Sequence, residues 1–167
     1  MKRNIEVKAR AQDLEALEKR VRQLADSGPA VLRQDDTFLA SPAGRLKLRK
    51  LSDTEGELIY YERPDTSMPT ESRYAIARTP APGDLLDVLS RSVGVVGVVR
   101  KERSLYLIGQ TRVHLDRVEG LGDFVELEVV LLPGQDAEDG VRIARELMTK
   151  LAIPENALVE KAYVDLL

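Results

Sequence analysis

The chain has 167 residues, 43% hydrophobic and 32% charged, which is typical of a folded domain and excludes a disordered chain. It contains no cysteine, so disulfides, zinc–thiolate sites and thiol nucleophiles are all excluded. The net charge of −3, from 25 basic and 28 acidic residues, argues against a nucleic-acid partner, because such binders usually carry a basic excess.

No segment of the sequence indicates targeting or division into several domains. No apolar run approaches the roughly 18–20 residues that span a bilayer, and the first residues lack the apolar stretch of a secretory signal. We therefore expect a cytoplasmic protein without a membrane partner. The chain also lacks repeats and long linkers, so residues 1–167 are predicted to form a single domain.

The first third of the chain switches between two periodicities. Residues 2–10 alternate between charged and apolar side chains, which predicts a strand. Residues 12–25 carry leucine and valine at helical spacing, and Ser27-Gly28-Pro29 is expected to stop this helix. A second strand is predicted over 32–39, and a third over 45–49, where every odd position is basic.

The middle of the chain continues the strand pattern. A turn leads into a predicted strand over 57–63, and a short strand is expected over 72–78. Leu85, Leu86 and Leu89 then share one face of a predicted helix.

The last part of the chain adds more strands and a final helix. The expected strands cover residues 95–103, 104–108, 111–118 and 123–132. Asp136 is a candidate N-cap for a helix that Pro154 closes. About eight strands and three helices predict an α+β fold with a mainly antiparallel sheet, which is expected to curl into a barrel.

Many of the predicted strands place ionic side chains on one face and Leu, Val or Ile on the other. One interpretation is that the ionic faces meet water, as in any half-buried sheet. The other is an inverted barrel whose apolar outside is covered by helices and whose interior is charged. The basic set would be Lys8, Arg45, Lys47, Arg49, Arg73, Lys101, Arg103 and Arg112, and the acidic set Glu6, Asp116, Glu126 and Glu128.

The two charge sets together suit a metal-chelated polyphosphate. Arginine and lysine neutralise phosphate oxygens. Convergent carboxylates without cysteine or paired histidine suit a hard, oxygen-loving ion such as Mg²⁺ or Mn²⁺. Alternation alone cannot decide which face is inside.

Motifs spread over nearly the whole chain resemble those of the CYTH family, which is named for class IV adenylyl cyclases and thiamine triphosphatases. Ile5-Glu6-Val7-Lys8 is similar to the Glu-x-Glu-x-Lys signature of that family. The other matching segments, in order, are residues 34–38, 45–49, 101–103, 114–116, 120–128 and 163–167. The match at 120–128, Gly-Leu-Gly-Asp-Phe-Val-Glu-Leu-Glu, is the most specific.

The resemblance implies an eight-stranded antiparallel β-barrel, the triphosphate tunnel, with helices packed outside. By position it implies that Glu6, Glu126 and Glu128 hold metal with Asp116 assisting. The implied phosphate ligands are Lys8, Arg45, Lys47, Lys101 and Arg103, with Arg49, Arg73 and Arg112 added mainly by strand parity. Lys8, Arg103 and Asp116 are the expected catalytic residues.

Four features leave alternatives open. The first glutamate of the signature is Asn4, which offers a carbonyl oxygen without charge and puts a second metal ion in question. Arg63 is a candidate for the position where the family often has a phosphate-binding lysine. His114, the only histidine, is either a structural hydrogen-bonding group or a base. Tyr60 and Tyr61 either pack in the core or stack on a base.

The resemblance favours a class IV adenylyl cyclase that converts ATP to cyclic AMP and pyrophosphate. The alternatives are a phosphohydrolase acting on inorganic triphosphate, thiamine triphosphate or a nucleoside triphosphate, and a non-catalytic binding module. The expected partner is a small-molecule triphosphate and the expected cofactor Mg²⁺ or Mn²⁺. Either a monomer or a homodimer is consistent with the sequence.

Overall fold

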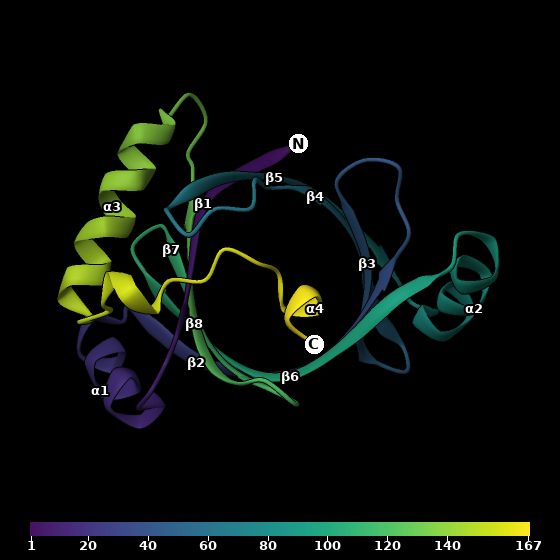
Figure 1. The fold of residues 1–167 in the computed structure, drawn as a ribbon, viewed down its shortest axis with the longest axis horizontal. Coiled ribbons are helices and arrows are strands. Elements are labelled where there is room, and N and C mark those ends of the chain that lie inside the picture. Colours follow the sequence, from purple (N-terminus) through teal and green to yellow (C-terminus); the bar gives the residue numbers. More distant parts are fainter.

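The computed structural model describes residues 1–167 and contains eight strands that close into a barrel (Figure 1). The strands are β1 (Lys2–Arg10), β2 (Ser27–Leu39), β3 (Arg45–Ser52), β4 (Glu55–Glu62), β5 (Thr70–Thr79), β6 (Val95–Ile108), β7 (Thr111–Val118) and β8 (Gly122–Val130). They close in the order β1-β5-β4-β3-β2-β6-β7-β8, and every neighbouring pair is antiparallel. The predicted eight-stranded antiparallel barrel is therefore confirmed.

Three longer helices lie outside the barrel wall, and a short fourth helix lies across one opening (Figure 1). The outer helices are α1 (Leu14–Leu24), α2 (Pro82–Ser92) and α3 (Ala137–Lys150); a 3₁₀ turn (Glu155–Ala157) and α4 (Tyr163–Leu166) follow. Asp13 caps α1 by accepting a hydrogen bond from the Ala16 amide at 3.0 Å. None of these helices has the length and apolar character required to cross a bilayer.

The main hydrophobic core lies between the outside of the barrel and helices α1 and α3. In β1 the odd positions Ile5 and Val7 point outward and are buried, and in β8 the same holds for Val125, Leu127 and Val129. The helix α3 approaches β1 so closely that a Cβ on Gly140 would lie 2.4 Å from the Ile5 side chain. The apolar strand faces therefore meet helices, and the ionic faces are left for the barrel interior.

Several predicted boundaries were wrong. The predicted strands 95–103 and 104–108 form the single strand β6, because its pairing with β2 and β7 runs on through Arg103, Ser104 and Leu105 without a break. The strand β2 begins at Ser27, within the segment expected to stop the preceding helix and before the predicted start at residue 32, and its register with β6 shifts between Ser27 and Ala30. The α4 helix was not predicted.

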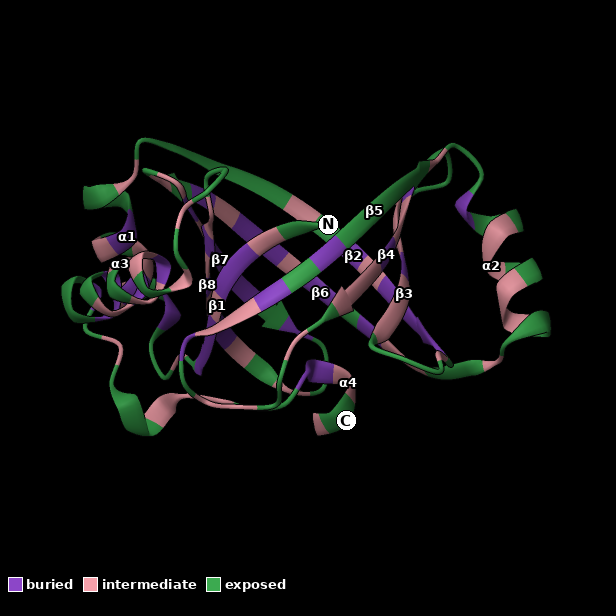
Figure 2. Cartoon of the chain, turned by 90° about the horizontal axis from the view of Figure 1, so that it is seen from above, coloured by how far each residue is buried: buried purple, intermediate pink, exposed green.

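A second, smaller apolar cluster fills one end of the barrel. It consists of Phe38, Val99, Val118, Phe124 and Tyr163. The first four come from strands β2, β6, β7 and β8, and Tyr163 begins α4, whose backbone crosses that opening (Figure 1). We refer to this as the capped end of the barrel. Figure 2 shows α4 below the barrel, with the buried Tyr163 region at its start.

Candidate active site

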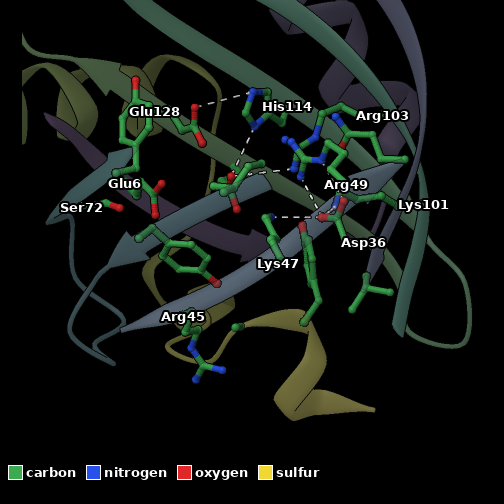
Figure 3. A pocket seen from close by; sticks show the side chains of 18 of the residues that line it. Glu6, Asp36, Arg45, Lys47, Arg49, Ser72, Lys101, Arg103, His114 and Glu128 are labelled. Carbon is green, nitrogen blue, oxygen red and sulfur yellow. Dashed lines mark hydrogen bonds and ion pairs between the residues drawn. The ribbon is translucent and has the colours of Figure 1, made fainter. Parts of the chain in front are cut away.

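A cavity of about 310 Å³ occupies the barrel interior and is lined by all eight strands and the C-terminal tail (Figure 3). Its charged lining residues are Glu6, Lys8, Asp36, Arg45, Lys47, Arg49, Glu57, Arg63, Asp65, Lys101, Arg103, Arg112, Glu126 and Glu128. Because strand side chains alternate, charged residues at every second position of one strand reach the same space. The structure thus favours the inverted-barrel interpretation over ionic faces in bulk water.

One side of the cavity holds a cationic cluster built around Asp36 (Figure 3). Lys47 Nζ lies 3.1 Å and Lys101 Nζ 3.0 Å from Asp36 Oδ2. Arg49 donates two hydrogen bonds of 2.8 Å to the same carboxylate, one to each oxygen. Three cations thus share one buried anion, so the cluster carries a surplus of positive charge.

Burial of this cluster changes the pKa values of its members. Burial alone would raise the pKa of the Asp36 carboxyl, but the charges of Lys47, Lys101 and Arg49 hold it well below its usual range. Burial lowers the pKa of the Lys101 ammonium to about 7, against the opposing attraction of Asp36. The cluster therefore contains an ammonium group that a bound polyanion would help to keep protonated.

Across the cavity lies a cluster of three carboxylates and one imidazole. Glu6 pairs with Glu128 across β1 and β8, and His114 pairs with Glu126 across β7 and β8. The His114 Nδ1 lies 3.3 Å from Glu126 Oε1, and its Nε2 lies 3.9 Å from Glu128 Oε2. Ligand atoms of His114, Glu126 and Glu128 all lie within 4.8 Å of one another.

The donor set of this carboxylate cluster fits a divalent cation. Burial, followed by repulsion from Glu128 and Glu126, raises the pKa of Glu6 to about 8. The amide oxygen of Asn4, on the same face of β1, is buried and has no hydrogen-bond partner. Convergent carboxylates with a free carbonyl oxygen are the ligands that hard divalent ions take in proteins.

A third group links the barrel wall to the capped end. Arg103 donates two hydrogen bonds of 2.7 Å to Asp116, and the Tyr163 hydroxyl donates one of 2.8 Å to the same carboxylate. Asp116 is fully buried and does not line the cavity. The structure therefore shows Asp116 positioning Arg103, and it does not group Asp116 with the side chains that could hold a metal ion.

The remaining predicted cations divide between the two faces of the wall. Lys8 and Arg112 line the cavity beside the carboxylates, with Lys8 Nζ 3.7 Å from Glu126 and Arg112 Nε 2.9 Å from Glu128. Arg73 is exposed on the outer face of β5 and contacts Glu71. The prediction that Arg73 faces the tunnel was therefore wrong.

The C-terminal tail contacts three cations of the cavity. Arg45 forms an ion pair with Asp165 of α4. Arg63 lines the cavity, donates a 2.7 Å hydrogen bond to the Glu160 carbonyl and lies 3.9 Å from Glu6. Lys8 Nζ lies 3.9 Å from the centre of the Tyr163 ring.

Sequence reasoning missed Asp36 and Tyr163 as site residues. The alternation of Gln34, Asp36 and Phe38 on β2 could have placed Asp36 inside, but the adjacent Asp35 fits the opposite parity equally well. No local pattern signals Tyr163, because its contacts come from strands that are distant in sequence.

The end of the cavity away from the cap is aliphatic. Along β2 the lining runs from Phe38 at the cap through Asp36 and Gln34 to Leu32, and β6 likewise ends at Leu105. Leu51 and Ile76 complete this lining from β3 and β5. The Gln34 side chain is buried here, and its Oε1 has no hydrogen-bond partner. We call the part of the cavity lined by Leu32, Leu51, Ile76 and Leu105 the aliphatic end.

Comparisons with known proteins identify the class to which this barrel and its charged interior belong. The CYTH domain matches residues 2–163, so the chain belongs to the CYTH family. Adenylate cyclase CyaB of Aeromonas hydrophila is 24% identical, over 77% of this chain and 80% of that protein.

Solved structures share the same fold. The PH1012 protein of Pyrococcus horikoshii superposes with a TM-score of 0.88 at 26% identity and covers 98% of this chain and 99% of its own. HpAC1 of Hippeastrum, described as a candidate adenylyl cyclase with a dominant triphosphatase activity, has a TM-score of 0.64 at 16% identity, over 97% of this chain and 91% of that chain.

Proposed function

We propose that this chain is a metal-dependent enzyme that acts on the triphosphate group of a nucleotide or another triphosphate bound inside the barrel. The observation that carries the proposal is the presence of a cationic cluster and a carboxylate cluster in one enclosed cavity. A polyphosphate chelated to a divalent ion matches both clusters at once. Membership of the CYTH family supports the same substrate class.

The chain's own cations would bind and orient the phosphates. Lys47, Arg49 and Lys101 share only one carboxylate, so their surplus charge is available to phosphate oxygens. Arg103 is fixed by Asp116, and Lys8 is fixed by Glu126 and the Tyr163 ring. Groups held in place in this way stabilise developing charge without reorganising during the reaction. We assign Lys8 and Arg103 to this catalytic role.

Glu6, Glu126 and Glu128 would hold Mg²⁺ or Mn²⁺. A bound ion of this kind offsets negative charge on phosphate oxygens while the leaving group departs. The Arg112 guanidinium orients Glu128 through its 2.9 Å contact, and Lys8 does the same for Glu126 at 3.7 Å.

Our first candidate reaction is adenylyl cyclisation. The ribose 3′-hydroxyl would attack the α-phosphorus of ATP and lose its proton to solvent, a new P–O bond would form, and the bond to pyrophosphate would break. The similarity to CyaB supports this chemistry. The aliphatic end supports it too: Leu32, Leu51 and Leu105 offer an apolar surface for a base, and the unpartnered Gln34 oxygen can accept a hydrogen bond from an adenine amine.

The second candidate is hydrolysis of a triphosphate to a diphosphate and phosphate. The dominant triphosphatase activity described for HpAC1 favours it. A non-catalytic binding module is the third candidate, and Asn4 supports it because it removes one charge from the family signature.

One product assay separates the three candidates. The chain is incubated with ATP, inorganic triphosphate and thiamine triphosphate, each with Mg²⁺ or Mn²⁺, and the products are identified. Cyclic AMP with pyrophosphate selects the cyclase, and phosphate release selects the hydrolase. Tight binding without turnover selects the module. Failure to bind any of these triphosphates would refute the proposal.

Glu128→Gln tests the assigned metal role. The substitution keeps the size of the side chain and removes its charge, so we expect metal-dependent activity to fall at least about a hundredfold while the thermal melt stays near that of the parent. The matched control is Arg73→Gln on the outer face, which should retain activity. Unchanged activity in Glu128→Gln would remove this residue from the site.

A further inference from the structure

His114 has surroundings that an ordinary buried histidine does not need. It is the only histidine of the chain, it is 4% exposed, and it lines the cavity. Its two ring nitrogens face two different carboxylates, Glu126 and Glu128. Figure 3 shows the His114 ring beside the Glu128 carboxylate, with dashed contacts from the ring.

The two contacts differ in kind. Nδ1 lies 3.3 Å from Glu126 Oε1, which is within hydrogen-bond reach. In the tautomer whose Nδ1–H donates to that carboxylate, Nε2 carries the lone pair that a metal ion needs. Nε2 lies 3.9 Å from Glu128 Oε2, too far for a hydrogen bond. Two ligand atoms bound to one ion at about 2.0–2.2 Å each lie about 3–4 Å apart, so this gap suits an ion between them.

A histidine that ligates a metal typically donates its other ring N–H to a carboxylate, which fixes the tautomer. His114 has that arrangement, with Glu126 as the acceptor. The buried, unpartnered amide oxygen of Asn4 faces the same cavity from β1. This oxygen is a second potential metal ligand without a hydrogen-bond partner. In the family signature the same position is a glutamate, whose carboxylate would make the site more negative.

We propose that His114 Nε2 is itself a metal ligand, and that this mixed nitrogen–oxygen site prefers a first-row transition ion such as Mn²⁺ or Zn²⁺ over Mg²⁺. The inference rests on the proposed function, because it concerns the same ion. Imidazole suits transition ions, whereas Mg²⁺ takes oxygen ligands and retains its waters.

The single histidine allows a direct test by NMR on the tag-free chain. With ¹⁵N-labelled protein, the imidazole resonances belong to His114 alone. We expect Zn²⁺ to shift the Nε2 resonance in a saturable way and Mg²⁺ to leave it nearly unchanged. If Zn²⁺ saturates the protein while the Nε2 resonance stays in place, the inference is overturned.

A calorimetric titration of variants gives an independent readout. Gln in place of His114 offers an oxygen, so His114→Gln should weaken Mn²⁺ and Zn²⁺ binding by about ten- to a hundredfold and change Mg²⁺ binding by less than about threefold. Arg73→Gln is the control and should bind all three ions as the parent does. Equal losses for Mg²⁺ and Mn²⁺, or no loss for either, would contradict the inference.

Two further variants separate this inference from the proposed function. If Glu126→Gln and Glu128→Gln lose metal binding while His114→Gln does not, the carboxylate site stands and only the histidine ligand fails. If neither carboxylate variant loses metal binding, the proposed metal site itself fails.

Discussion

Lys101 has an acid–base property that should appear directly in ligand binding. Burial lowers its pKa to about 7, so its ammonium loses its proton near neutrality in the free protein. A triphosphate beside the group favours the charged form, so binding is coupled to proton uptake above this pKa. Affinity for inorganic triphosphate, measured without metal, should therefore fall as the pH rises through 7. We expect Lys101 to contribute about a tenfold loss between pH 6 and 8.

The control for this pH effect is Lys101→Arg. An arginine stays protonated over the whole range, so the variant retains only the pH dependence of the ligand and of other groups. The difference between parent and variant isolates Lys101. Parallel affinity profiles for the two proteins would show that the Lys101 charge does not take part in binding.

Asp116 offers a second test at the level of single residues. Asp116→Asn removes the carboxylate that accepts two hydrogen bonds from Arg103 and leaves Glu126, 3.8 Å away, as the remaining anion beside this buried charge, so we expect the free energy of unfolding to drop by about 3 kcal/mol. Metal affinity should stay within about threefold, because Asp116 acts on Arg103. Chemical denaturation and calorimetry measure the two quantities on the same sample. Lost metal affinity with unchanged stability would restore Asp116 as a ligand.

At the scale of elements, helix α4 competes for a cation that phosphate would use. Asp165 pairs with Arg45, and both side chains are partly exposed. Such pairs contribute at most about 1 kcal/mol, so Asp165→Asn should raise affinity for inorganic triphosphate by up to about fivefold. Asp53→Asn, on an exposed turn, removes the same charge away from the cavity and serves as control. An unchanged or weaker affinity in Asp165→Asn would argue against this competition.

How well each strand could be predicted depended on how different its two faces are. Over residues 45–49 of β3 and 125–129 of β8, charged and aliphatic residues alternate strictly, so both the strand and its inward face followed from the sequence. On β5 the inward residues Ser72, Tyr74 and Ile76 alternate with Arg73, so neither face is distinctly polar. The prediction for Arg73 therefore relied only on its odd or even position along the strand, and it placed Arg73 on the inner face of the barrel instead of the outer face.

At the scale of the whole molecule, the sequence predicted the barrel and most of the charged lining, but not how the charges pair. Lys47, Arg49 and Lys101 can all pair with Asp36 only because β3 and β6 both lie beside β2. The alternation of charged and apolar residues does not specify which strands are neighbours. The hydrogen bonds from Arg103 and Tyr163 to Asp116 likewise require the C-terminal tail to fold back over the barrel. Contacts between distant segments need the strand order as well as the strand pattern.

The charged interior also makes overall stability depend on ligand. A triphosphate with its ion would relieve repulsion within both clusters, and it binds only the folded chain. At a hundred times its dissociation constant it should add about 2.7 kcal/mol, which raises the melting temperature by about 5–10 °C. Differential scanning calorimetry with and without ligand checks this. A melting temperature that does not change at saturating ligand would contradict binding inside the barrel.

The cap formed by α4 and the apolar residues around Tyr163 has a kinetic consequence. Because the cap closes one end of the cavity, a nucleotide that enters with its phosphates first must leave through the end by which it entered. After cyclisation, pyrophosphate would lie behind the cyclic nucleotide, so it would depart last. The sequence of product departure would then follow from the shape of the channel, whichever product is held more tightly.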